Sequence, residues 1–373
     1  MIEFCHSQAQ ETAIFQTTTF KKQSAIVFTA VFLLAASVEA QSDAVVRWNR
    51  IATDAAVAAK MDPLTESRVF SILHVAIHDA LNTIYRRYEP YRLQAQASRE
   101  ASAEAAIAAA SHATLVELMP MQKSQFDASF AEALGAIQNG EAKAAGLEVG
   151  RKAAATILAV RKNDGASRTV AREPGKKPGE YRPTPPDSTP AWFAHWAEVT
   201  PFVMKSPEQF RPVPPPAVTS ARALADMEEV KEIGAEKSVT RTAEQSEIRE
   251  AGDREWINYL PTPPVPDYPS THTVLGAAAA AAMEGFFGTD FISFTMTSGA
   301  PYPGLTRKFW SFSEAARENG ASRVLAGIHF ATAVSAGYLQ GTQIGVWVAD
   351  NALRPVKTSN QAPISRMSSE SPR

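Results

Sequence analysis

Pro269-Ser270-Thr271-His272 stands directly ahead of an alanine-rich stretch, and Ser322-Arg-Val-Leu-Ala-Gly-Ile-His329 follows about fifty residues later. A serine after a proline cluster is a typical helix N-cap, so we expect a helix over about 273–287. The free N–H groups and the dipole of a helix N-terminus favour an anion. His272 stands where it could donate a proton to that anion. Taken alone, the segment is better explained as a plain helix cap beside a histidine.

In the second segment, Arg323 and His329 would point about 120° apart on a continuous helix. They converge only if the chain turns between them, and Gly327 permits a turn because glycine readily adopts positive φ. Arg323 would then bind two oxygens of a phosphate-like group through its planar guanidinium. His329 would supply a nucleophilic or ligating nitrogen. The alternative is a surface arginine and a core histidine without any joint role.

Together, Pro-Ser-x-His and Ser-Arg-x-x-x-Gly-x-His resemble motifs two and three of the vanadium haloperoxidase and type 2 phosphatidic acid phosphatase superfamily. Four further segments are similar to exported bacterial members, so the resemblance covers nearly the whole chain after residue 40. These segments are residues 69–84, 205–212, 260–267 and 312–316. The resemblance implies an all-α helical bundle of this type, shortened.

The resemblance also implies roles for the motif residues. His329 would be the axial ligand of vanadate in a haloperoxidase, or the nucleophile in an acid phosphatase. His272 would be the general acid–base, and Ser270, the backbone N–H of Thr271 and Arg323 would bind equatorial oxygens. Vanadate and the phosphoryl transition state are both five-coordinate, which is why one pocket suits both. The small-molecule partners would be peroxide and halide in the first case and a phosphate ester in the second.

Two features depart from the family pattern. Thr271 stands where glycine is usual; it keeps its N–H but resists positive φ. Motif one, Lys-x6-Arg-Pro, is not found, and only the ten residues 249–258 separate Ile248 from Tyr259 where the family carries a helix pair with that motif. The candidates to replace its cations are Lys231, Lys237, Arg241 and Arg249.

The missing motif supplies two of the three cations around the oxyanion, so an anion held by Arg323 alone is under-compensated. Loss of one charged partner from a buried site costs ~3–5 kcal/mol. A relative that keeps the helical scaffold without catalysis is therefore a third hypothesis beside the two enzymes.

Periodicity and turn residues predict the rest of the architecture. Asp62 and Pro63 begin a helix, and apolar residues recur at helical spacing as far as Ile84. Further helices are predicted at 101–118, 122–137, 141–160, 220–233, 242–249 and 329–349. No convincing alternating strand segment is present, so we expect no sheet.

These elements divide the chain into regions. A leader at 1–40 precedes an N-terminal helical region at 41–170. Residues 171–218 form a connection rich in proline and large aromatics, which predicts ordered packing because exposed aromatics are costly. The C-terminal helical region at 219–354 carries the oxyanion site, and a disordered tail at 355–373 follows.

Bulk properties limit the partners and the compartment. A net charge of −2 and a pI near 6.4 give no sign of a nucleic-acid or anionic-membrane partner. Lys21 and Lys22, an apolar stretch at 25–36 and Val-Glu-Ala at 38–40 resemble a secretory signal, which predicts a periplasmic or secreted protein without a stable membrane span. The one cysteine, Cys5, lies in this leader, so thiol chemistry is excluded after cleavage.

Three other patterns have structural explanations. His74 and His78 lie four residues apart and could bind a metal, but packing is favoured because no third ligand is evident. Asp79 is expected to be a buried hydrogen-bond acceptor. Gly337, Gly341 and Gly345 recur every four residues, which indicates close packing of soluble helices.

Overall fold

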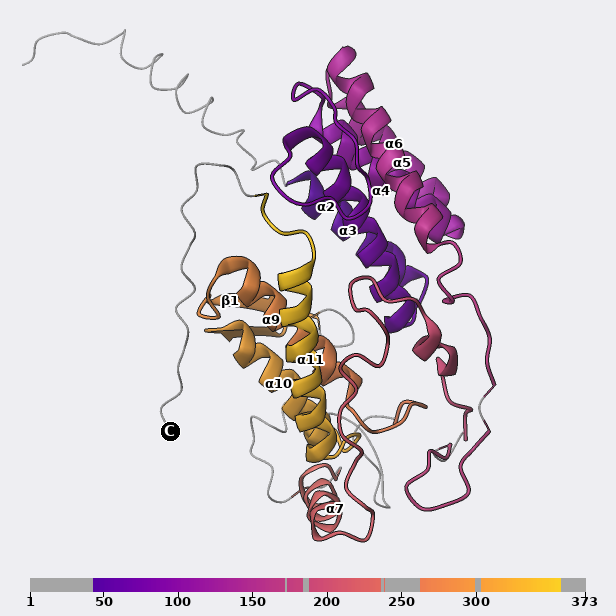
Figure 1. The fold of residues 1–373 in the computed structure, drawn as a ribbon, viewed down its shortest axis with the longest axis vertical. Helices are drawn as coiled ribbons and strands as arrows, with labels where there is room; N and C mark the ends of the chain where they lie inside the picture. The colour runs from indigo at the N-terminus through magenta and orange to yellow at the C-terminus, as the bar shows by residue number, and fades with distance from the viewer. Residues whose placement is uncertain are drawn as a thin grey trace, which may run out of the picture.

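The computed structural model describes residues 43–171, 173–183, 188–235, 238, 262–298 and 303–356. Several sequence-based predictions lie outside these residues: the leader, the helix at 242–249, the interval at 249–258, most of the tail and the cations Lys237, Arg241 and Arg249. The described part is mostly helical, which confirms the all-α fold (Figure 1). No helix within it is both long and apolar enough to cross a membrane.

An N-terminal bundle occupies the upper part of Figure 1. It consists of α2 (Ala44–Ala58), α3 (Pro63–Tyr85), α4 (Ala103–Leu118), α5 (Lys123–Gly135) and α6 (Glu141–Arg161). Helices α3, α4 and α6 pack on one another around the main hydrophobic core, in which Trp48, Leu73 and Phe126 are fully buried. Helix α2 is absent from the sequence-based predictions, although it contributes Trp48 to this core.

Local sequence signals begin these helices as expected. The Asp62 carboxylate accepts a hydrogen bond from the Thr65 N–H at 2.8 Å, and Pro63 is the first residue of α3. Asp79 is buried and accepts hydrogen bonds from the backbone N–H groups of residues 91–93, which confirms its predicted role. His74 contacts the Asn49 side chain and His78 the Glu89 carbonyl, so both histidines have structural partners.

The C-terminal helices form the lower part of Figure 1: α7 (Ala221–Ile233), α9 (Thr271–Phe287), α10 (Phe312–Leu325) and α11 (Ala331–Asn351). Helix α9 packs along both α10 and α11. A Cβ atom on Gly337, Gly341 or Gly345 would lie 2.7, 2.3 or 2.4 Å from a backbone carbonyl oxygen of the α9 segment. The three glycines therefore allow two helix backbones to approach closely, as predicted.

A small hairpin corrects the expectation of no sheet. Strands β1 (Phe294–Thr297) and β2 (Thr306–Phe309) pair antiparallel, with Phe294 opposite Phe309. Each strand has only four residues, and the last three residues of β1 are all exposed while β2 alternates, so the pattern is too short to distinguish a strand from a loop. The hairpin is stabilised by aromatic contacts of Phe294 with Phe309 and Phe312.

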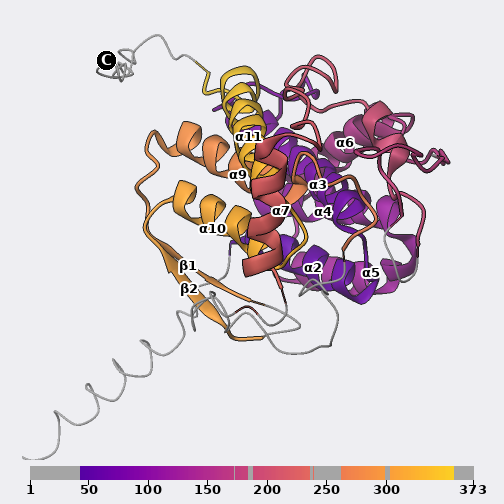
Figure 2. The same cartoon turned by 90° about the horizontal axis from the view of Figure 1, so that it is seen from below.

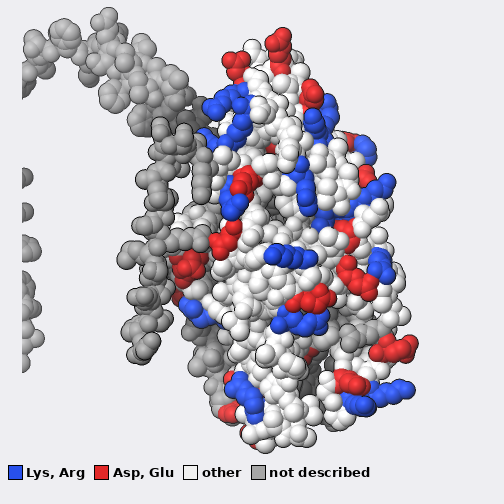
Figure 3. Space-filling view, viewed as in Figure 1, with Lys and Arg blue, Asp and Glu red and all other residues white. Residues whose placement is uncertain are grey.

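The connection between the two helical regions packs against both of them around Phe202, although Trp192 is 50% exposed, contrary to the predicted packing of all its large aromatics. It contains the short 3-10 helix η2 (Ala194–Glu198), whereas the other 3-10 helix, η1 (Pro120–Gln122), joins α4 to α5. The Arg161 guanidinium lies 4.0 Å from the Phe202 ring, and the Trp347 indole donates a hydrogen bond to the Val203 carbonyl at 3.2 Å. The connection thus contacts both helical regions, which Figure 2 shows side by side. Basic and acidic side chains are interspersed over the face in Figure 3.

Candidate functional site

The first motif lies at the N-terminus of α9. Ser270 is fully buried at the N-cap position, but its hydroxyl makes no capping bond and instead accepts a hydrogen bond from the Thr273 hydroxyl at 3.0 Å. The Ser270 hydroxyl proton is therefore available to another acceptor. The first-turn N–H groups of α9 have no acceptor within the helix. Thr271 is helical, so its replacement of glycine requires no left-handed backbone here.

The second motif ends α10 in a tight turn. Gly327 has a φ of +72°, and the Ile328 N–H donates to the Arg323 carbonyl at 3.1 Å while the Gly327 N–H donates to the Val324 carbonyl at 2.9 Å. These two bonds form a Schellman motif, the usual helix ending with glycine in the left-handed region. The predicted turn between Arg323 and His329 is therefore present, and its geometry depends on glycine.

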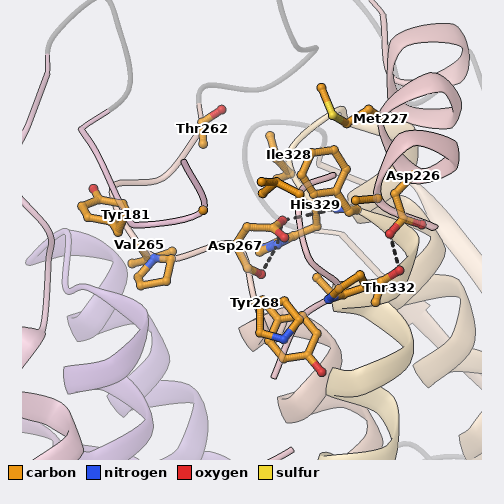
Figure 4. Close-up of a pocket in the computed structure, with 18 of the residues that line it drawn as sticks. Tyr181, Asp226, Met227, Thr262, Val265, Asp267, Tyr268, Ile328, His329 and Thr332 are labelled. Atoms are coloured by element: carbon orange, nitrogen blue, oxygen red, sulfur yellow. Dashed lines mark hydrogen bonds and ion pairs between the residues drawn. The ribbon is translucent and has the colours of Figure 1, made fainter. Parts of the chain in front are cut away.

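His329 is held by Asp267. The His329 residue is 3% exposed, and its Nδ1 lies 2.9 Å from the Asp267 carbonyl oxygen and 3.0 Å from Asp267 Oδ1 (Figure 4). Both neighbouring atoms are acceptors, so Nδ1 carries the proton and donates. In the neutral ring the lone pair is then on Nε2, which is the nitrogen free to bind a ligand or attack an electrophile.

Asp267 is the residue of the candidate site that the sequence analysis missed. Its Oδ1 also accepts from the Phe330 N–H at 3.2 Å, so one carboxylate oxygen fixes the histidine ring and the backbone beside it. The sequence offered one signal, an acidic residue two positions before Pro269. It ends the segment 260–267, which resembles exported bacterial members of the family. No spacing rule links residue 267 to residue 329.

Arg323 is half-buried, and one of its hydrogen-bond donors has no described partner. Its Nε is fully buried and has no hydrogen-bond partner in the part of the chain that the structure describes. Burial lowers the pKa of the Arg323 guanidinium, which nevertheless stays charged because arginine titrates far above neutrality. A buried cationic donor without a partner is costly, and an anion would relieve this cost.

His272 faces the same space as the other two motif side chains. Burial, together with the charges of Arg323 and His329, lowers the pKa of His272 to about 4, although the residue retains exposed surface. This coupling places His272 near both Arg323 and His329. The structure thus brings together the three side chains that the motifs predicted to converge.

The cations around this space are few. Lys231, a suggested substitute for motif one, lies exposed in the last turn of α7, and the other three substitutes lie outside the described residues. Arg323 is thus the permanent cation that motifs two and three supply. No group of three or more His, Cys, Asp or Glu side chains within the described ranges could hold a metal ion. The donor set is suited to an oxyanion.

Comparisons with known proteins agree with this architecture. Residues 218–358 match the family model described as the VCPO second helical-bundle domain. The chain is similar in structure to a bacterial vanadium-dependent iodoperoxidase, with a TM-score of 0.70 and 22% identity over 84% of this chain and 97% of that chain. It is also similar to a bacterial vanadium-dependent chloroperoxidase, with a TM-score of 0.55 and 17% identity over 76% of this chain and 90% of that one. No curated protein matches.

The fold is an all-α helical bundle in which the motif side chains lie near one another between the start of α9 and the end of α10. The predicted resemblance to the vanadium haloperoxidase superfamily is confirmed: the chain has that fold, and the superfamily's second helical-bundle domain matches residues 218–358.

Proposed function

We propose that the protein binds vanadate between the α9 N-terminus and the α10–α11 turn, and that it acts as a vanadate-dependent haloperoxidase. The observation that carries the proposal is the fully buried Nε of Arg323, which has no partner among the described residues and lies near the two motif histidines. An oxyanion would supply the missing acceptor. The similarity to iodo- and chloroperoxidases favours vanadate.

The residues present fit such an anion. His329 Nε2 would be the nitrogen that ligates the vanadium, because Asp267 holds the opposite ring nitrogen. Arg323, the Ser270 hydroxyl and the backbone N–H of Thr271 would bind the vanadate oxygens. His272 would accept or return a proton at the edge of the site. Vanadate, when bound, would activate peroxide for the oxidation of halide.

The protonation state of His272 indicates whether it accepts or donates a proton. A pKa of about 4 makes the imidazole neutral at pH 7, so His272 is a proton acceptor there before any anion binds. Burial is the largest cause of this low pKa, and the charges of Arg323 and His329 add to it; a bound oxyanion would offset those charges. The same histidine would then become able to hold a proton and donate it.

Two other functions use the same atoms. In an acid phosphatase, His329 Nε2 would attack phosphorus in place of ligating vanadium. A non-catalytic relative would bind the oxyanion weakly, and the supply of one permanent cation by the motifs favours this possibility over the phosphatase. The experiment described next distinguishes the phosphatase and the non-catalytic relative from the haloperoxidase.

A vanadate titration by calorimetry tests the proposal. We expect saturable binding to the full chain, lost in His329→Ala and retained in His112→Ala, whose ring lies on α4 far along the chain from the motifs and contacts Asp127. Bromination of a dye with peroxide, dependent on vanadate and His329, would establish the peroxidase. Vanadate-inhibited hydrolysis of p-nitrophenyl phosphate would establish the phosphatase instead. Binding without either turnover leaves the non-catalytic relative, and no binding overturns the vanadate site.

Export is a separate proposal. It rests on the leader-like residues 21–40, and its test is N-terminal sequencing of the protein from the producing cell. A mature chain that begins at Gln41 in the periplasm or medium would support export, and an intact leader in the cytoplasm would oppose it.

A further inference from the structure

Thr273 lies where the three C-terminal helices α9, α10 and α11 meet. It is fully buried on α9, three residues after the Ser270 N-cap. A Cβ atom added to Gly320 of α10 would lie 3.2 Å from the Thr273 methyl carbon, and one added to Gly337 of α11 would lie 3.1 Å from Thr273 Cβ. The two glycines leave the space that the threonine side chain fills, so packing on both sides fixes its rotamer.

The Thr273 hydroxyl bonds to Ser270 and not to the backbone. Its Oγ1 donates to Ser270 Oγ at 3.0 Å, and both side chains are fully buried. A threonine inside a helix commonly bonds to the carbonyl oxygen four residues earlier. Five other threonines of the described helices do so: Thr53, Thr83, Thr114, Thr156 and Thr342. Thr273 therefore departs from the usual partner at the position beside the candidate site.

This bond determines where the Ser270 proton points. Ser270 Oγ already accepts from Thr273, so its own single proton is directed away from Thr273. The Ser270 side chain also makes no bond to the first-turn N–H groups, although a serine at an N-cap ordinarily accepts one. The Ser270 hydroxyl and those N–H groups are thus left as donors at one helix end, which suits an anion.

The position of Ser270 is also fixed through its backbone. Its N–H donates to the Ala333 carbonyl at 3.0 Å, which ties it to the first turn of α11 just after His329. On the other side, Thr273 packs against α10 about one turn before Arg323. The pair therefore lies where the start of α9 meets the two segments that carry the other motif side chains.

We propose that Thr273 is a positioning residue, whose hydroxyl holds Ser270 as a hydrogen-bond donor toward the bound oxyanion. The inference rests on the proposed function, because it concerns the same anion site. Thr273 does not contact the anion and acts only through Ser270. Two hydroxyls in series that end on a charged oxygen also strengthen each other, since each hydrogen bond polarises the next.

Two substitutions separate the hydroxyl of Thr273 from its shape. Thr273→Val keeps the branched shape and removes the hydroxyl, whereas Thr273→Ser keeps the hydroxyl and removes the methyl group. In calorimetric titrations of the full chain with vanadate, we expect the dissociation constant to rise about fivefold in Thr273→Val and to stay within about twofold in Thr273→Ser. A role in packing alone predicts the opposite order, because serine leaves a void beside Gly320.

Thr114→Val is the matched control, because Thr114 is also fully buried and its hydroxyl donates to a carbonyl oxygen within α4. Vanadate binding should be unchanged in this variant. Circular dichroism checks that each variant folds. If Thr273→Val does not fold, Thr273→Ala compared with Thr273→Ser repeats the test, since both lack the methyl group and only Thr273→Ser keeps the hydroxyl.

A double-mutant cycle tests whether Thr273 acts through Ser270. Ser270→Ala should itself weaken vanadate binding, and adding Thr273→Val should cause no further loss, because no Ser270 hydroxyl remains to be held. Additive losses, equal losses in Thr273→Val and Thr273→Ser, or unchanged binding in a folded Thr273→Val variant would each overturn the positioning role while leaving the vanadate site in place. Absence of binding to the unaltered chain would overturn both proposals together.

Discussion

His329 Nδ1 lies 3.0 Å from Oδ1 of Asp267, a residue 62 positions earlier in the chain, and 2.9 Å from the carbonyl oxygen of the same aspartate. A histidine whose Nδ1 has two acceptors is fixed in tautomer and in ring orientation. The unprotonated Nε2 then points away from Asp267. This relationship makes His329 suitable as a ligand or nucleophile.

Replacing Asp267 should therefore weaken oxyanion binding without abolishing it. In Asp267→Ala the main-chain acceptor remains, but the carboxylate that also accepts from Nδ1 and helps to fix the ring is lost. We expect the vanadate dissociation constant to rise about tenfold, at the lower end of the range for groups that orient metal-binding histidines. Calorimetry measures the change. Asp54→Ala is the control, because Asp54 is exposed on α2, and an equal loss there would contradict the assignment.

Arg323 should lower the stability of the protein and be required for vanadate binding. Arg323→Met removes a buried donor without a described partner, so the free energy of unfolding in urea should rise by about 1 kcal/mol. The same variant should lose measurable vanadate binding. A variant that is less stable than the parent chain would show that the guanidinium already has a partner in the folded protein.

The pH dependence of stability should report on His272. Its pKa is about 4 in the folded chain and 6.5 in the unfolded chain, so the unfolded state binds a proton first as the pH falls. The unaltered chain should therefore lose stability relative to His272→Asn as the pH falls from 6.5 to 4. No further difference should develop below 4 or above 6.5. Urea unfolding across this range measures both curves, and parallel curves would contradict the lowered pKa.

Oxyanion binding should raise the pKa of His272. Inorganic phosphate is a suitable probe because it provides the same negative oxygens without redox chemistry. Its charge would offset those of Arg323 and His329, so the imidazole signal in an NMR titration should move toward a higher pKa when phosphate is added. The shift should be absent in Arg323→Met. A His272 pKa that does not respond to phosphate would place the anion elsewhere.

Gly337 should be intolerant of a side chain. A Cβ atom there would lie 2.7 Å from the Ser270 carbonyl oxygen, so Gly337→Ala must separate α11 from the start of α9. We expect a loss of about 1–3 kcal/mol in the free energy of unfolding, together with weaker vanadate binding. Gly135→Ala is the matched control, because Gly135 ends α5 with nothing within 4 Å of the added atom. That variant should be neutral or slightly stabilised.

Prediction from the sequence succeeded where the controlling interactions are local. Asp62 begins α3 through a bond to the N–H three residues later, and Gly327 ends α10 through bonds within one turn. The glycine pattern of α11 also identified a close helix contact, because its period matches the helix. Helix α2 was missed, and the four-residue strands were too short for their pattern to be distinguished from a loop.

Prediction failed where residues meet through the tertiary fold. Asp267 was not assigned, because its contact with His329 depends on how the segment before α9 lies against the α10–α11 turn. The unpartnered Nε of Arg323 was also not predictable, since burial and the absence of an acceptor are properties of the packed structure. A cavity of about 430 Å³ on the Asp267 side of His329 has the same origin, because its walls come from five separate parts of the chain.

The amino-acid sequence is enough to predict the helical class, the boundaries set by caps and glycines, and which histidines and arginine carry the motifs. Those features depend on interactions between residues within a turn or two of one another, or on residue identity alone. The packed structure is needed to establish which nitrogen of His329 is free, which side chains lie near it, and where an apolar cavity is left. Each of these depends on long-range packing, in which atoms distant in the chain compete for the same space and the same hydrogen bonds.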